Sequence, residues 1–148
     1  MKTGKNLPAA ITIFVAKVYL TKRKLIPALY NLYIDNHLPS AFTINCVDFV
    51  KEEEDIFKQD LLEGINEFSR NGQADEKQWT GFAKHINYLQ GDFLKTETYS
   101  ALKGKLDAFG KQQKVSISRV YYFATAPRFI EIIAEGLYKH NLEKLDKL

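Results

Sequence analysis

Glycine is scarce in the first half of this 148-residue chain: it has eight glycines in all, and none lies between Gly4 and Gly64. Cysteine is scarcer still. The single Cys46 excludes an intrachain disulfide and a cysteine-based metal cluster, and we expect a buried thiol in a protein of the reducing cytoplasm. Long apolar runs are also missing, since Ala9 to Ala16 is far below the roughly 18 residues that a membrane-spanning helix needs. The start, Met1 to Gly4, does not resemble a secretory signal, so no membrane is expected as a partner.

A large excess of one charge is missing as well. The chain has 21 Lys and Arg residues against 18 Asp and Glu residues, and its one compact basic cluster is Lys22-Arg23-Lys24. A nucleic-acid-binding protein normally carries a wider basic surface, so no nucleic-acid partner is expected. The three histidines, His37, His85 and His140, share no metal-ligand spacing. We therefore expect no metal site and assign the histidines to structural roles.

What is present is the pattern of one globular domain. The composition, with 45% apolar and 26% charged residues, is ordinary, and the length corresponds to a single domain over residues 1 to 148. Amphipathic stretches predict five helices. Strands that alternate with helices predict an α/β fold, a three-layer and mostly parallel sheet with helices on both faces. Runs rich in β-branched and aromatic residues predict its strands: Ala10 to Val15, Thr43 to Val47, Ile86 to Leu89 and Val120 to Ala124.

Individual residues set the expected ends and faces of the helices. Pro27 is a position where the first helix can kink. Asp75 is expected to cap the third helix, Gly110 to end the fourth and Pro127 to begin the last. In the first helix, the apolar residues that recur at helical spacing are expected to face the core: Leu25, Leu29, Leu32 and Tyr33.

The turn after the first strand is where a sheet of this kind would bind the pyrophosphate of a dinucleotide, normally with a glycine-rich loop. Here the chain has Val15, Lys17, Val18 and Tyr19, with no glycine. Valine and tyrosine do not readily adopt positive φ angles, and their β-carbons would lie where phosphate oxygens approach the backbone. One flexible lysine does not replace several preorganised backbone amides. The residues alone therefore do not predict a nucleotide-binding turn, and they allow the first strand or helix to extend through Lys17 to Tyr19.

Five segments nevertheless carry a resemblance, and together they span roughly residues 7 to 142: Ile11 to Phe14, Leu20 to Tyr33, Asn66 to Arg70, Tyr88 to Phe93 and Tyr121 to Phe129. They resemble the N-terminal region of the glucose-6-phosphate dehydrogenase family. The resemblance implies a Rossmann-like coenzyme domain that uses NADP, or in some members NAD. It implies an oxidoreductase of the pentose phosphate pathway, and so of glucose and carbohydrate metabolism, that oxidises glucose 6-phosphate to 6-phosphogluconolactone.

The resemblance also implies that the family's catalytic His-Asp pair lies beyond position 148, in a C-terminal catalytic domain that is absent from this chain. We therefore expect no catalytic residue here and no turnover by the isolated chain. A small-molecule coenzyme is the expected partner.

Site residues are implied position by position. Lys24 matches the family lysine that reaches the sugar phosphate and the coenzyme, and its alternative is a solvated helix lysine. The loop along the coenzyme is matched by Ala124, Thr125 and Pro127, which could instead be only a strand end and a helix start.

The sequence departs from the family in two places, at the first turn and after the second strand. Val15, Val18 and Tyr19 replace the two glycines and the aspartate of the family's Gly-x-x-Gly-Asp-Leu turn, so weak coenzyme binding is expected. The family arginine that holds the 2′-phosphate aligns with Phe49, which follows Asp48. The Asp48 carboxylate favours a coenzyme with a ribose 2′-hydroxyl over one with a 2′-phosphate. The alternative role of Asp48 is that of a turn residue at a strand end. A non-catalytic scaffold, natural or engineered, that has lost nucleotide binding is the alternative function.

Overall fold

The computed structural model describes residues 7–15, 21–69 and 72–142, without the side chains of Thr21 and Lys22. Its core is a four-stranded sheet in the order β3-β2-β1-β4, in which every neighbouring pair is parallel. The strands are β1 Ala9–Val15, β2 Phe42–Asp48, β3 Ile86–Gln90 and β4 Ser118–Ala124. All four strands lie within two residues of the predicted limits, and the predicted parallel sheet is confirmed.

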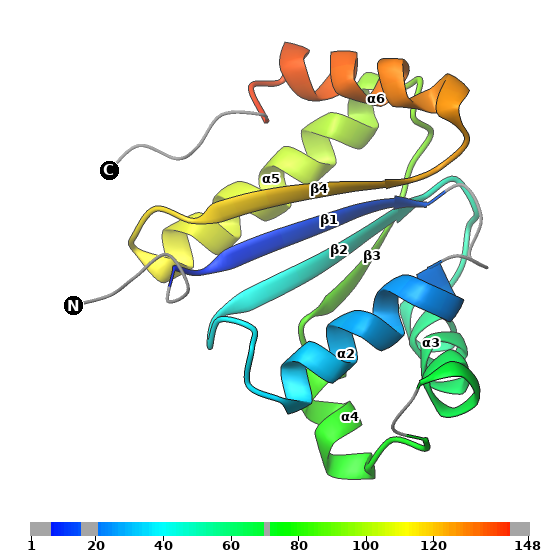
Figure 1. Cartoon of the computed structure of the whole chain (residues 1–148). Helices are drawn as coiled ribbons and strands as arrows, with labels where there is room; N and C mark the ends of the chain where they lie inside the picture. The colour runs from blue at the N-terminus through cyan, green and yellow to red at the C-terminus, as the bar shows by residue number, and fades with distance from the viewer. Residues whose placement is uncertain (1–6, 16–20, 70–71, 143–148) are drawn as a thin grey trace.

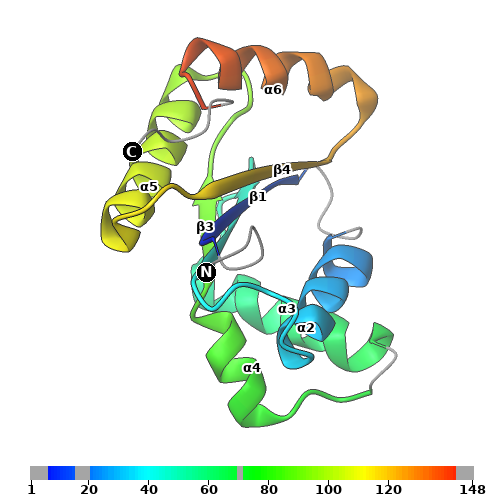
Figure 2. The same cartoon turned by 60° about the vertical axis from the view of Figure 1, so that its left-hand side comes forward.

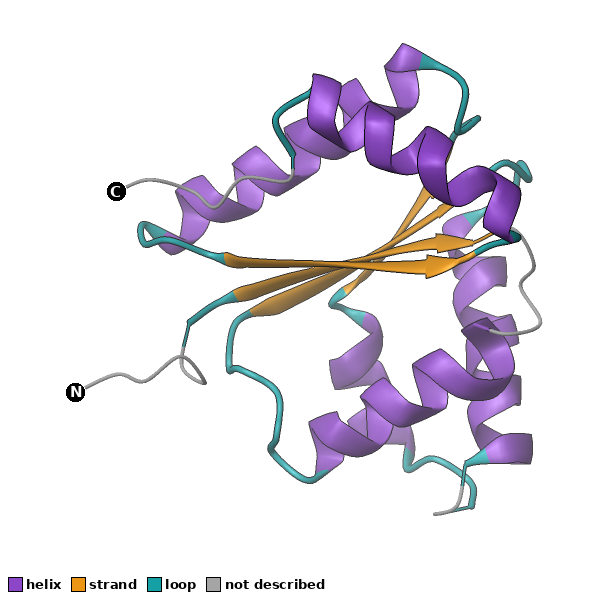
Figure 3. Cartoon of the chain, turned by 45° about the horizontal axis from the view of Figure 1, so that its top comes forward, coloured by secondary structure: helices purple, strands orange, loops and turns teal. Residues whose placement is uncertain are grey.

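Helices cover both faces of this sheet (Figures 1 and 3). One face carries α2 Ile26–Ile34, α3 Glu54–Phe68 and α4 Glu76–Ala83, and the other carries α5 Thr96–Gln113 and α6 Pro127–Lys139. The chain builds β1, β2 and β3 outward with its first helices on one side. It then returns over the opposite face through α5 to place β4 beside β1 (Figure 2). The expected three-layer α/β fold is confirmed.

The face under α2 and α4 is filled by five aromatic side chains, which we call the aromatic layer: Tyr30, Tyr33, Phe42, Trp79 and Phe82. Phe82 is fully buried, and its ring centroid lies 5.3 Å from those of Tyr30 and Tyr33. Asp75 caps α4 as predicted, because its Oδ2 accepts a hydrogen bond from the Gln78 amide at 3.0 Å. The cap thus fixes the helix that carries Trp79 and Phe82.

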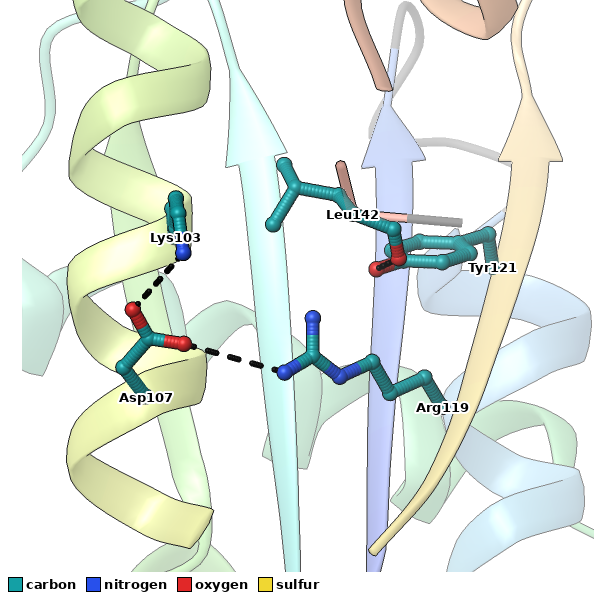
Figure 4. A network of polar contacts seen from close by, with 5 residues as sticks. All are labelled: Lys103, Asp107, Arg119, Tyr121 and Leu142. Carbon is teal, nitrogen blue, oxygen red and sulfur yellow. Dashed lines mark hydrogen bonds and ion pairs between the residues drawn. The ribbon is translucent and has the colours of Figure 1, made fainter. Parts of the chain in front are cut away.

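On the opposite face of the sheet, α5 and α6 approach each other closely, and polar side chains connect α5 with β4. A β-carbon at position 136 of α6 would lie 2.3 Å from the Tyr99 ring of α5, so glycine is required for the two helices to pack at this distance. Asp107 of α5 forms ion pairs with Lys103 of the same helix, at 3.0 Å, and with Arg119 of β4, at 3.7 Å. Figure 4 shows how these three side chains lie between α5 and β4. These contacts attach the edge strand β4 to α5.

Two expectations about helices need correction. The first concerns the apolar face of the first helix: Leu25, Leu29 and Tyr33 pack against the core as expected, but Leu32 is 42% exposed. The buried residues of α2 are Ile26, Pro27 and Tyr30. A π-helical segment, η2 Thr21–Leu25, precedes α2. Within α2, Ile26 and Tyr30 lie one turn apart on the buried face, and Leu32 lies to one side of that face. Pro27 lies in the first turn of α2, where its missing N–H is not needed, rather than at a kink.

The second error concerns the end of α5. This helix continues past Gly110 to Gln113. Lys114 ends it in the left-handed conformation (φ 59°), and its amide donates a hydrogen bond to the Gly110 carbonyl at 3.1 Å. A glycine inside a helix costs only about 1 kcal/mol, which the packing of an 18-residue helix can offset.

Candidate functional site

A cavity of about 380 Å³ opens at the carboxyl edge of the sheet. Parallel α/β sheets bind their ligands at this edge, and the volume is within the usual range of small-molecule sites. Each strand contributes its last residue or the loop that follows it. The lining residues are Val15, Asp48, Phe49, Val50, Asp92, Phe93, Ala126, Arg128 and Phe129.

Hydrogen bonds from β3 hold the loop after β2 in place. The Gly91 amide donates to the Asp48 carbonyl at 2.8 Å, and Gln90 Nε2 donates to the Phe49 carbonyl at 3.3 Å. The hydroxyl of Tyr88 donates to the Val50 carbonyl. The backbone at the mouth of the cavity is therefore fixed before any ligand arrives.

Asp48 is the polar residue that this loop positions. It is the last residue of β2 and only 3% exposed, and its Oδ1 accepts a hydrogen bond from the Val50 amide at 3.4 Å. Burial raises the pKa of the Asp48 carboxyl, and the amides of Val50 and Phe49 partly oppose this rise. A carboxylate oxygen at a strand end can accept a hydrogen bond from a ligand hydroxyl.

Aromatic rings supply the apolar part of the cavity. Phe93 and Phe129 meet edge to face with their centroids 5.7 Å apart, and the Arg128 guanidinium lies over the Phe129 ring at 4.8 Å. Phe49 is 65% exposed at the mouth. An acceptor carboxylate beside aromatic surface suits a nucleoside, which has both hydroxyls and a flat base.

The structure brings some predicted site residues together and keeps another apart. Val15 and Asp48 are register partners on β1 and β2, and both line the cavity. Lys24 does not line this cavity. It lines a second cavity of about 520 Å³ between α2 and α3, and the two cavities have none of their described lining residues in common. There the Arg23 guanidinium lies 4.7 Å from the centroid of the Phe68 ring. Lys17, Val18 and Tyr19 lie outside the described residues.

In the segment after β4, the residues that line the cavity alternate with the site residues predicted from the sequence. Ala124 is the buried last residue of β4 and pairs with Val15, Thr125 donates to the Ala126 carbonyl, and Pro127 begins α6 as expected. The cavity is lined instead by the interleaved Ala126 and by Arg128 and Phe129.

Asp92, Phe93, Arg128 and Phe129 were not predicted as site residues. Both pairs fall inside the segments that carry the family resemblance, Tyr88 to Phe93 and Tyr121 to Phe129, and that was the signal available.

His85, His140 and Cys46 have structural environments. His85 Nδ1 lies 2.8 Å from the Phe42 carbonyl and His140 Nδ1 lies 2.9 Å from the Gly136 carbonyl. Burial raises the pKa of the Cys46 thiol to about 12, as expected for a core thiol. Within the described ranges, no group of three or more His, Cys, Asp or Glu residues could hold a metal ion. Nor does that part of the chain contain a helix long and apolar enough to cross a membrane.

Comparison with known proteins places the chain in a family. Residues 12–148 match the sequence profile described as "Glucose-6-phosphate dehydrogenase, NAD binding domain". The chain belongs to this family. It is 32% identical over 145 residues to glucose-6-phosphate 1-dehydrogenase of Chlamydia muridarum, with 94% of this chain and 28% of the relative covered. It is 33% identical over 137 residues to the Chlamydia pneumoniae protein, with 91% and 26% covered.

Solved structures of similar fold agree. A glucose-6-phosphate dehydrogenase in complex with its substrate glucose-6-phosphate superposes with a TM-score of 0.82 at 24% identity, over 95% of this chain and 29% of that one. The Mycobacterium avium enzyme gives 0.76 at 24% identity, over 92% and 28%. The chain spans less than a third of the length of these relatives. The family description makes a nicotinamide coenzyme the ligand class of the domain.

Proposed function

We propose that the cavity at the carboxyl edge is the coenzyme site of a dehydrogenase acting on glucose 6-phosphate. In this proposal residues 1 to 148 are one coenzyme-binding domain of an oxidoreductase of the pentose phosphate pathway. The observation that supports it most is the position of the cavity. It lies at the ends of β1 and β2 and beside the β4–α6 loop, within the residues that match the family. The single buried Cys46 supports a cytoplasmic location.

The family resemblance implies NADP as the coenzyme and 6-phosphogluconolactone and NADPH as products. The coenzyme supplies the hydride acceptor, and the residues of this chain supply binding and orientation. Asp48 would accept a hydrogen bond from the adenosine ribose, and Ala124, Thr125 and Pro127 would fix the loop along the coenzyme. The proposed role of Lys24 in binding rests on the family match, because Lys24 and Asp48 line different cavities.

The isolated chain is proposed to be inactive and weak in binding. Neither of the histidines His85 and His140 is placed to act as a base at the cavity, since each ring is held against a backbone carbonyl. Val15 brings a side chain where the family has glycine, and we expect dissociation constants for NADP or NAD of about 1 mM or weaker.

Amide chemical shifts during titration of the ¹⁵N-labelled chain with NAD and with NADP test this proposal. Saturable shifts at Phe49, Val50 and Phe129 are expected, without comparable shifts at Phe42 and Ser118, which begin β2 and β4 at the opposite edge of the sheet. The absence of any saturable shift would contradict the proposal and favour a scaffold that has lost nucleotide binding.

A further inference from the structure

Charge is distributed unevenly around the proposed coenzyme cavity. Asp48 follows β2 and Asp92 follows β3, and these strands are neighbours with Asp48 in register with Gln90. Arg128 is the one cation among the described lining residues, and it follows β4, on the far side of β1. Its guanidinium lies over Phe129. The β2–β3 side of the cavity is thus acidic, and the positive charge lies two strands away.

The β2 side is where the ribose of a dinucleotide's adenosine half lies in a parallel sheet of this order. The pyrophosphate crosses the end of the first strand, and an acidic residue at the end of the second meets the ribose hydroxyls. Asp48 occupies that position in this chain. The adenosine ribose would therefore face the Asp48 carboxylate.

The next residue offers nothing to a phosphate. Phe49 is apolar and 65% exposed, and its carbonyl accepts a hydrogen bond from Gln90. The Tyr88 hydroxyl holds the neighbouring Val50 carbonyl. Because both carbonyls are held by β3, the loop is fixed in a conformation with an apolar side chain at its outer end.

We infer that Asp48 determines coenzyme specificity in this chain and selects NAD, with a free 2′-hydroxyl, over NADP. The inference rests on the proposed function and differs from the coenzyme that the family resemblance implies. A ribose 2′-hydroxyl can donate a hydrogen bond to the Asp48 carboxylate. A phosphate monoester carries roughly 1.5 to 2 negative charges at pH 7, so it would be repelled by Asp48. We expect NAD to bind at least about tenfold more tightly than NADP.

The full 148-residue chain is titrated with NAD and NADP, and separately with AMP and adenosine 2′,5′-bisphosphate, while the Phe49 and Val50 amide shifts are followed. The two smaller probes report on the ribose end without the pyrophosphate turn. AMP is expected to bind more tightly than the bisphosphate. Asp48→Asn is expected to reduce this preference several-fold, because it removes the charge and keeps the shape. Asp35→Asn, at the exposed end of α2, is the matched control and should leave the preference unchanged.

Phe49→Arg provides a second variant at an exposed position, where folding is not at risk. It restores a cation beside the ribose and is expected to raise NADP affinity relative to NAD. Equal or tighter binding of NADP by the original chain would overturn the inference and leave the proposed function intact. An NAD preference that Asp48→Asn does not change would also overturn it. Shifts with none of the four ligands would overturn the proposed function itself.

Discussion

Phe82 is fully buried, whereas Phe49 is 65% exposed, although both lie against the same sheet. Phe82 belongs to the aromatic layer, where its ring has neighbours on several sides, at centroid distances of 5.3 Å to Tyr30 and 5.8 Å to Trp79. Phe49 belongs to the cavity at the carboxyl edge, where hydrogen bonds from β3 fix its backbone but not its ring. The aromatic layer thus stabilises the fold, and the cavity presents surface to a ligand.

Val15 links the two regions. It is fully buried in the core that contains the aromatic layer, and it also lines the cavity. A glycine at this position, as in the family, would open the cavity but remove side-chain atoms from the core. In this chain the residue at the end of β1 therefore favours packing over access to the backbone.

Removal of a ring from the aromatic layer should have the largest effect. Phe82→Ala is expected to lower the free energy of unfolding by about 3–5 kcal/mol, because it leaves a cavity in a fully packed region. Urea denaturation measures the change. The matched control is Phe49→Ala, for which a change within about 0.5 kcal/mol is expected at an exposed site. Similar losses from both substitutions would contradict the distinction between the two regions.

The sheet could be predicted from the sequence because each strand is a short apolar run bounded by helix or turn signals. The parallel arrangement follows from the alternation of strands and helices, and it was correct for β1 to β4. The face of α2 was predicted only in part, because this helix carries apolar residues around most of its circumference, and spacing alone does not show whether Tyr30 or Leu32 faces the core. The end of α5 was missed because Lys114, a residue with a β-carbon, adopts the left-handed cap conformation.

For the candidate site, sequence reasoning reached Val15 through the turn after the first strand, and Asp48 through the family resemblance, as the residue before the position of the family arginine. It did not reach Asp92, in the loop after β3, or Phe129, in the first turn of α6, which are far apart in the chain. These residues meet because the strand order puts β4 beside β1 and β3 beside β2, and that order depends on long-range pairing. A pattern read along the chain does not contain this information.

Reversion of the turn to the family pattern tests how far Val15 controls the cavity. Val15→Gly, Lys17→Thr, Val18→Gly and Tyr19→Asp together are expected to raise coenzyme affinity at least tenfold, about 1.4 kcal/mol. Backbone amides could then approach the pyrophosphate at the helix N-terminus. Isothermal titration of the original and reverted chains measures the gain.

A variant with the last three changes that keeps Val15 is the control for this experiment. It should retain more stability, because Val15 stays in the core, and should gain less affinity. Saturable micromolar binding by the original chain, or no gain in a folded reverted chain, would show that the turn does not control binding.

A smaller effect is expected at the cap of α4. Asp75→Ala should lower the free energy of unfolding by about 1 kcal/mol, because it removes the acceptor for the Gln78 amide. Hydrogen exchange should increase in α4 more than in α5, since the cap holds only the helix that carries Trp79 and Phe82. Asp75→Asn retains an acceptor and should behave like the original chain. An equal loss with asparagine would show that the charge, rather than the cap, matters.

The smallest expected effect concerns the pH dependence of stability at Asp48. Burial raises the pKa of this carboxyl in the folded chain, so the folded state holds the proton more firmly than the unfolded state does. Below the unfolded pKa, about 3.9, both states are protonated and the favourable contribution is complete. As the pH rises through the folded pKa this contribution is lost, and a buried charge remains. Asp48→Asn has no such charge, so its stability relative to the original chain should increase between about pH 3 and pH 7. Urea denaturation across this range measures the difference, with Asp35→Asn as the control at an exposed position. A difference that is constant with pH, or that decreases as the pH rises, would contradict the burial of the Asp48 charge at the mouth of the cavity.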